Sequence, residues 1–273
     1  MCCGGAGFGG TKAGELELAS PARGLRRALA PGTGGVSSLA VLWCDNHVLA
    51  IEKPAGLPSV PDESGDESAL DLARVWVKQE YKKPGDVFLG VVHRLDRPVS
   101  GVLCFGRTSK GAARLTESLR ERQVQKTYLG VVEGELSGEG LLEQTLLKDQ
   151  AANRVMVVGH GTEGARLAST RWRVLRSEGR TSLVELEPLT GRSHQLRLAC
   201  ATLGVPLLGD LKYGAESALP DRSVALHSLR FCTPHPTREE WLRVECRPPG
   251  GAWWKIAAGV RVQSGGTLVE AKA

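Results

Sequence analysis

One short segment of the sequence gathers side chains that could do chemistry. Residues 91–106, VVHRLDRPVSGVLCFG, place ionisable side chains between two apolar runs: His93, Arg94, Asp96 and Arg97. Pro98 and Gly101 predict a loop at this point, and loops that leave a rigid scaffold often carry catalytic groups. The alternative is a structural ion pair between Asp96 and Arg97 where a strand ends.

Two familiar reactions of carboxylates fit this segment poorly. The catalytic loop of a protein kinase has Asp directly after His-Arg, and it is accompanied by a Gly-rich loop and a D-F-G motif. Here Leu95 separates Arg94 from Asp96, and the other motifs are absent. A glycosidase needs a second carboxylate that faces the first, and no sequence signal places the nearest candidate, Asp210, beside Asp96. The sequence therefore disfavours hydrolysis.

A second segment, TGRSHQLRLACATLG, could supply a partner for this carboxylate. Its spacing predicts a helix with an apolar stripe of Leu196, Ala199 and Leu203. Arg197 lies beside that stripe and could reach a buried anion. A carboxylate beside a guanidinium stays ionised at neutral pH, because the positive charge offsets its desolvation. A contact between Arg197 and Asp96 would therefore explain a charged side chain within the core.

Three further residues each have two interpretations. His194 is either a structural histidine with satisfied hydrogen bonds or part of the site, and Arg192 is either solvated or turned toward a phosphate. On the strand-like segment KTYLGVVEG, Tyr128 lies on the face opposite Leu129 and Val131. It either packs against a second layer or stacks its ring on an unstacked RNA base.

The composition is that of a globular protein. The chain has 273 residues, 41% of them hydrophobic, and a net charge of +5, which permits RNA binding without proving it. Its seven cysteines have no C-x-x-C pair and no zinc-like Cys/His spacing, so we expect free thiols and no metal site. We find neither a long apolar run nor a signal-peptide core, so we expect a cytoplasmic protein without membrane spans.

The order of predicted elements favours an α+β fold with a mixed, mainly antiparallel sheet and flanking helices. Residues 1–38, rich in Gly, Ala and Arg, are expected to form a flexible tail. A hairpin around an Asp45-Asn46 turn begins the ordered part. Later strands are expected at residues 125–134, 140–147, 154–158, 167–176, 181–187, 225–234 and 239–249.

Two helices are expected before those later strands. The first opens at Ser68, which Asp71 complements as in a capping box, and its apolar face is predicted to be Leu72, Val75 and Trp76. The second covers residues 108–124 and is predicted to turn its apolar face inward and most of its arginines outward. That apolar face consists of Ala112, Leu115 and Leu119.

Taken together, the ordered motifs resemble the RluA-type RNA pseudouridine synthase family. They are KPAGLP at 53–58, HRLDRPVSG at 93–101, KTYLGVVEG at 126–134, TGRSHQLRLACATLGVPLLGDLKYG at 190–214 and LHSLRF at 226–231. The resemblance covers about residues 40–247. It implies a pseudouridine-synthase catalytic domain over residues 39–260, with tails at 1–38 and 261–273. It also implies an isomerase that needs no cofactor and no metal.

The same resemblance implies roles for particular residues. Asp96 would be the nucleophile and Arg197 its ion-pair partner, while Tyr128 would stack on the base and accept the proton at carbon 5. Arg94 would fill the space left by a flipped nucleotide, and Leu198 would line the base pocket. The remaining expected substrate contacts are Arg192 and His194.

The chain departs from the family pattern at Val99, where Thr is common, at Glu52, where Asn is common, and at Ala199, where His is common. None of these is a proposed catalytic position. We expect an RNA substrate, ribosomal or transfer RNA, and a monomer without an S4-type RNA-binding domain in residues 1–38. The alternative function is a catalytically silent RNA-binding relative that assists RNA folding or assembly.

Overall fold

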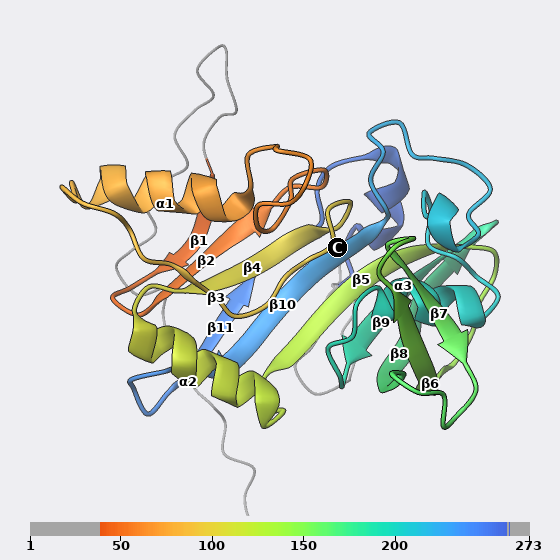
Figure 1. The fold of residues 1–273 in the computed structure, drawn as a ribbon. Coiled ribbons are helices and arrows are strands. Elements are labelled where there is room, and N and C mark those ends of the chain that lie inside the picture. The colour runs from red at the N-terminus through yellow and green to blue at the C-terminus, as the bar shows by residue number, and fades with distance from the viewer. Residues whose placement is uncertain (1–38, 261, 263–273) are drawn as a thin grey trace, which may run out of the picture.

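The computed structural model describes residues 39–260 and 262. In this part of the chain one eleven-stranded sheet runs in the order β1-β2-β4-β10-β5-β9-β8-β6-β7, with β3 paired to β4 and β11 to β10 (Figure 1). The strands are β1 (Ala40–Cys44), β2 (Val48–Lys53), β3 (Gly90–Val91), β4 (Ser100–Gly106), β5 (Gln125–Glu133), β6 (Glu139–Asp149), β7 (Arg154–Val158), β8 (Arg166–Glu178), β9 (Thr181–Pro188), β10 (Leu226–Pro234) and β11 (Trp241–Glu245). The helices are α1 (Ala69–Glu80), α2 (Ser109–Arg120) and α3 (Gln195–Thr202), with short 3-10 helices η1 (Leu211–Tyr213) and η2 (Ala252–Ala257).

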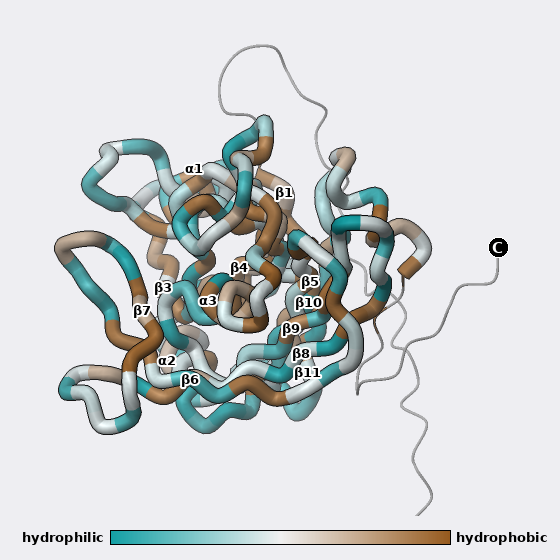
Figure 2. Tube along the Cα trace, turned by 90° about the vertical axis from the view of Figure 1, so that its right-hand side faces the viewer, coloured by the Kyte–Doolittle hydropathy of each residue, from teal (hydrophilic) through white to brown (hydrophobic). Residues whose placement is uncertain are grey.

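The predicted fold class is confirmed. Strands β4 and β10 pair in parallel, and the other strand pairs are antiparallel. Apolar residues gather toward the middle of the molecule, and hydrophilic residues are frequent in the outer loops (Figure 2). The predicted tails at 1–38 and 261–273 lie outside the described residues, apart from Val262, so the domain limits stay predictions.

Local sequence signals form the first elements as expected. Asp45 Oδ1 accepts the backbone N–H groups of His47 (2.7 Å) and Val48 (2.8 Å) and so closes the hairpin of β1 and β2. Ser68 caps α1, and its capping box with Asp71 is complete. These side-chain contacts satisfy backbone donors that a turn or a helix start would otherwise leave unpaired.

The apolar face predicted for α1 is wrong. The helix buries Ala69, Leu70, Ala73 and Val77, whereas Val75 is 49% exposed. Leu72 and Trp76 are only partly buried. Two neighbouring stripes of this helix are apolar, so helical spacing alone cannot select between them. The face predicted for α2 is confirmed, because Leu115 is buried and Ala112 and Leu119 are partly buried.

The parallel contact between β4 and β10 depends on a glycine. Gly101 has φ +116°, and a Cβ on it would collide with the backbone of Ser228 in β10. Only glycine tolerates this approach without strain. The contact brings the segment before β4, which carries Asp96, next to the strand beside β5.

Candidate active site

A buried lysine fastens the loop that carries Asp96. Lys53, at the end of β2, has no exposed surface and donates from Nζ to the carbonyl oxygens of Pro54 (2.8 Å), Leu57 (2.7 Å) and Arg97 (3.1 Å). Burial lowers the pKa of Lys53 to about 7, and the nearby Asp96 carboxylate opposes that shift. The sequence placed Lys53 in a motif but did not predict this attachment.

Two further contacts hold the same loop. Ser59 Oγ donates to the carbonyl of Leu95 (2.7 Å) and accepts its N–H (3.0 Å). Arg97 forms an ion pair with Asp66. The Asp96–Arg97 ion pair considered from the sequence is therefore not formed, and the guanidinium beside Asp96 comes from another element.

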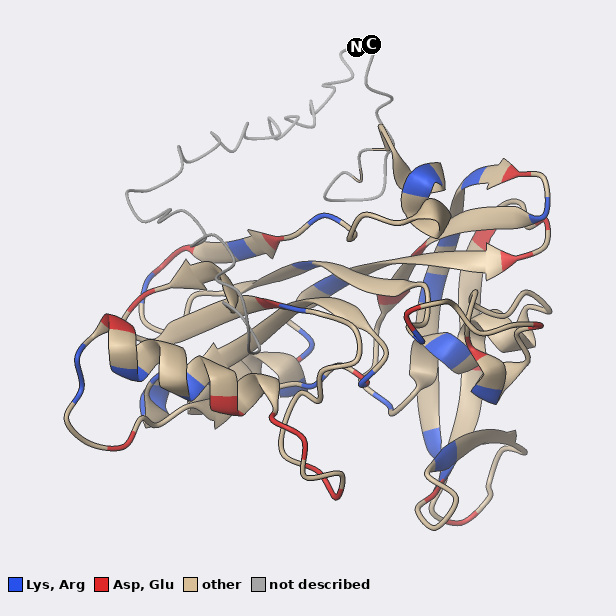
Figure 3. Ribbon diagram, turned by 90° about the horizontal axis from the view of Figure 1, so that it is seen from above, with Lys and Arg blue, Asp and Glu red and all other residues tan. Residues whose placement is uncertain are grey.

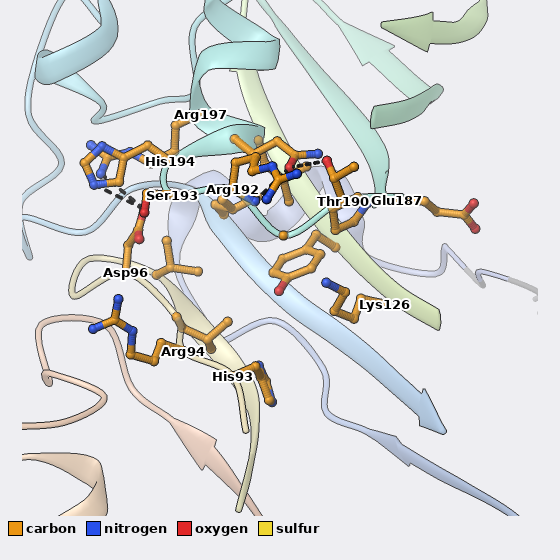
Figure 4. Close-up of a pocket in the computed structure, with 18 of the residues that line it drawn as sticks. His93, Arg94, Asp96, Lys126, Glu187, Thr190, Arg192, Ser193, His194 and Arg197 are labelled. Carbon is orange, nitrogen blue, oxygen red and sulfur yellow. Dashed lines mark hydrogen bonds and ion pairs between the residues drawn. The ribbon is translucent and has the colours of Figure 1, made fainter. Parts of the chain in front are cut away.

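That guanidinium belongs to Arg197, on α3. Its Nη1 lies 3.5 Å from Asp96 Oδ2, which is the contact the sequence suggested (Figure 4). Its stronger partner is Asp210, which accepts from Nε at 2.7 Å and from Nη2 at 2.5 Å. Burial lowers the pKa of Arg197, but the hydrogen bonds and charge of Asp210 outweigh it, so the pKa is raised. Arg197 therefore stays charged and held in one direction between two carboxylates.

Sequence reasoning missed this role of Asp210. Its side chain is 1% exposed, and it lies thirteen residues after Arg197, beyond the end of α3. Gly209, with φ +81°, turns the chain back at this point. The turn glycine next to an aspartate was the available signal, but it gives no direction for the carboxylate.

Tyr128 lies on β5 with the predicted orientation. Its ring belongs to the same apolar cluster as Leu95 and Leu196, while Leu129 and Val131 pack on the other face of the strand. Burial raises the pKa of Tyr128 to about 12, against the opposing effect of a hydrogen bond to Ser228. The side chain is therefore a neutral phenol near neutral pH.

His194 and Arg192 lie just before α3, and His194 lies beside Asp96. His194 has φ +52°, its Nδ1 is 2.6 Å from the Tyr213 hydroxyl, and its Nε2 is 3.9 Å from Asp96 Oδ2. Burial lowers the pKa of His194 although Asp96 raises it, so the ring favours its neutral form. Arg192 donates from Nε to the carbonyl of Leu167 (3.0 Å) and lines the cleft described below.

One predicted pocket residue is misplaced. Leu198 packs in a separate cluster with Leu146, Val155 and Tyr213, and it does not line the cleft. Leu196 lines the cleft instead. Positions two apart on a helix point in widely different directions, because each residue turns the helix by about 100°.

A cleft of about 1780 Å³ joins these residues. Asp96, Tyr128 and Arg197 lie in its lining together with Arg94. Cationic side chains are frequent around it, among them Arg94, Arg122, Lys126, Lys148, Arg192 and Lys212. The acidic lining residues are fewer: Asp62, Asp96, Glu139, Glu185 and Glu187. Asp62 belongs to a projecting loop between β2 and α1 that also carries Glu63, Asp66 and Glu67 (Figure 3). The cleft therefore suits an anionic chain.

Other site types find no support in the described part of the chain. Within it, no group of three or more His, Cys, Asp or Glu side chains could hold a metal ion. Every helix there is too short or too polar to span a bilayer. Cys2 and Cys3 lie outside the described residues. The cysteines within them are free: Cys44, Cys104, Cys200, Cys232 and Cys246.

Residues 47–202 match the model of a protein family described as RNA pseudouridylate synthase. The chain belongs to the RNA pseudouridylate synthase family. This match includes Asp96, Tyr128 and Arg197. The RluA-type resemblance of the sequence motifs is thus confirmed, and the chain is an RNA pseudouridine synthase.

Individual members of the RNA pseudouridylate synthase family agree with this. The chain is 35% identical to the RNA pseudouridine synthase YhcT of Bacillus subtilis, over 77% of this chain and 69% of the relative. It is 33% identical to the dual-specificity RNA pseudouridine synthase RluA of Yersinia pestis, over 72% of this chain and 93% of the relative. It is 31% identical to the ribosomal large subunit pseudouridine synthase C of Rickettsia conorii, over 77% of this chain and 68% of the relative.

A solved structure also shares the fold of this family. Human RNA pseudouridylate synthase domain containing 1 superposes with a TM-score of 0.63 at 27% identity, over 81% of this chain and 87% of that one. This likeness covers a larger share of the chain than the family match at residues 47–202 does.

Proposed function

We propose that this RNA pseudouridine synthase isomerises particular uridines of ribosomal or transfer RNA, with Asp96 as its nucleophile. The supporting observation is that Arg197 lies between Asp96 and Asp210 at a cationic cleft. Arg197 turns a positive charge toward the Asp96 carboxylate, and Asp210 holds Arg197 in that direction. A ribosomal target is also consistent with the name of the Rickettsia conorii relative.

The proposed reaction moves one bond of the sugar without adding water. An Asp96 oxygen bonds to carbon 1′ of the ribose while the bond to uracil N1 breaks, and that electron pair leaves with the uracil. The uracil rotates in the cleft, and its carbon 5 bonds to carbon 1′ as the Asp96 oxygen departs. The proton on carbon 5 then passes to a base. Bonds made and broken balance, and no oxidant is needed.

Tyr128 has two proposed roles in this sequence. Its ring stacks on the flipped uracil, and its phenolic oxygen accepts the proton from carbon 5. A phenol with a pKa of about 12 holds its own proton at neutral pH, so it relays the new proton only if its own moves on. Ser228, its hydrogen-bond partner, is the first group in that path.

The substrate contacts follow from positions around the cleft. We assign Arg94 to the space that the flipped nucleotide vacates and Arg192 to a phosphate of the RNA. His194 is assigned to a substrate contact beside Asp96. Leu196 replaces Leu198 as the apolar wall of the base pocket. We also propose a cytoplasmic monomer with a catalytic domain at residues 39–260, which light scattering and limited proteolysis would test.

Release of tritium from carbon 5 of uridine in RNA tests the function. The parent should release it, and Asp96→Asn should release none while RNA affinity stays within a few-fold, because phosphate contacts supply most of the binding energy. Asp86→Asn is the matched control, since Asp86 is exposed and lies outside the cleft lining. A parent that binds RNA without releasing tritium would instead favour the silent RNA-binding alternative.

A further inference from the structure

Lys126 is a cation in the cleft that the proposed reaction has not yet used. It lies on β5, two residues before Tyr128 and therefore on the same face of the strand. Figure 4 shows it pointing into the cavity, while Glu187 turns its carboxylate away. Among the described residues, no group forms a hydrogen bond or ion pair with the Lys126 ammonium, although its charge acts on the His93 ring.

Two other cations of the cleft, in contrast, have carboxylate partners. Arg197 is held by Asp210, and Arg97 is held by Asp66. Lys126 is partly buried, and burial lowers the pKa of its ammonium group. A desolvated cation without a counterion interacts strongly with any negative charge that enters the same space.

The reaction creates such a charge. When the bond between carbon 1′ and N1 breaks, the electron pair stays on the uracil and spreads from N1 to its two carbonyl oxygens. Hydrogen-bond donors fixed beforehand at the place where charge develops are among the strongest catalytic contributions. Alternate residues of a strand lie about 6.5 Å apart, so a base stacked on Tyr128 presents its edge within reach of the Lys126 side chain.

We propose that Lys126 is a catalytic residue that donates a hydrogen bond to a carbonyl oxygen of the departing uracil and stabilises its negative charge. The inference rests on the proposed function. No proton is transferred in this step, so the ammonium group is unchanged when the uracil rejoins the sugar through carbon 5. Lys126 therefore acts on the transition state for bond cleavage more than on binding of the RNA.

A fluorine at carbon 5 of the target uridine separates this role from a contact to phosphate. Fluorine withdraws electrons and stabilises the uracil anion by itself, so a donor that stabilises the same anion matters less. Disappearance of the target nucleoside is measured under single-turnover conditions, with the enzyme saturating, on a uridine RNA and on the same RNA carrying 5-fluorouridine. Carbon 5 of the fluorinated base has no proton to lose, so its product keeps the fluorine and only bond cleavage and rejoining are compared. Chromatography of nuclease digests gives both rates.

Lys126→Met should slow conversion of the uridine RNA by about 100-fold, the usual effect of losing one donor to a developing charge. On the 5-fluorouridine RNA, Lys126→Met should slow the reaction by about tenfold or less. Lys126→Arg keeps the charge and should recover most of the rate, which also shows that the fold tolerates a change at this position.

Lys148→Met is the matched control. Lys148 lines the same cleft but is exposed on β6, so its loss should weaken RNA binding and affect both substrates equally. Equal losses for Lys126→Met on the two RNAs, or a loss confined to binding, would make Lys126 a phosphate contact and overturn the proposal. A parent enzyme that converts neither RNA would overturn the proposed function itself.

Discussion

Replacing Lys53 by methionine should change how the stability of the protein depends on pH. The pKa of Lys53 is lowered from 10.5 to about 7 by burial, so between these values the unfolded chain binds more protons than the folded one. The stability contribution of this residue is therefore present above pH 10.5 and is lost as the pH falls through about 7. Each pH unit within that window is worth about 1.4 kcal/mol.

From about pH 7 to about pH 9, the parent should gain about 2 kcal/mol of unfolding free energy that Lys53→Met does not gain. Urea unfolding of both proteins at several pH values measures this, and subtracting the two curves removes every group they share. Lys83→Met is the control, because Lys83 is exposed and its variant should follow the parent. Parallel curves for the parent and Lys53→Met would refute the buried-lysine reasoning.

The same variant should also lose activity. Lys53 donates to the carbonyl oxygens of Pro54, Leu57 and Arg97, and methionine leaves all three without this donor. A shift of about 1 Å in a catalytic group can cost about 100-fold in rate. We therefore expect kcat for tritium release to fall by about 10- to 100-fold with little change in KM. A folded variant with the parent kcat would show that other contacts suffice to hold Asp96.

Two further substitutions test the residues around Asp96. Asp210→Asn should lower the free energy of unfolding by about 3 kcal/mol, because Arg197 loses its closest counter-charge in a buried site. It should also lower kcat without raising KM. Chemical denaturation and steady-state kinetics measure these effects, and an unchanged unfolding free energy together with an unchanged kcat would contradict the reasoning. Tyr128→Phe keeps a ring whose stacking is worth about 1 to 3 kcal/mol per base, so RNA affinity should persist while tritium stays on carbon 5. Release at the parent rate would leave Tyr128 with stacking alone.

The sequence by itself determined those features that depend on neighbouring residues. The strand β7 (Arg154–Val158) has the predicted limits, and Ser68 caps α1 with Asp71 as its motif indicates. Alternation placed Tyr128 and Leu129 on opposite faces of β5. Such features follow from backbone hydrogen bonds and side-chain direction within a few residues, which spacing along the chain encodes directly.

The motifs also predicted the contact between Asp96 and Arg197, which are separated by 101 positions, but only through the resemblance and the need of a buried carboxylate for a cation. The spacing of the residues along the chain does not predict how far apart Asp96 and Arg197 lie in space. The parallel pairing of β4 with β10, which Gly101 permits, brings the Asp96 loop to the strand beside β5.

Only the tertiary structure decided which of several equivalent candidates is used. Two stripes of α1 are apolar, and packing against the sheet buries the one with Ala73 and leaves Val75 exposed. Leu196 and Leu198 are both leucines of α3, yet only Leu196 lines the cleft. The environments of Asp210 and of the unpaired Lys126 arise from segments far apart in the chain, because burial and counter-charges are properties of the packed molecule and not of residue spacing.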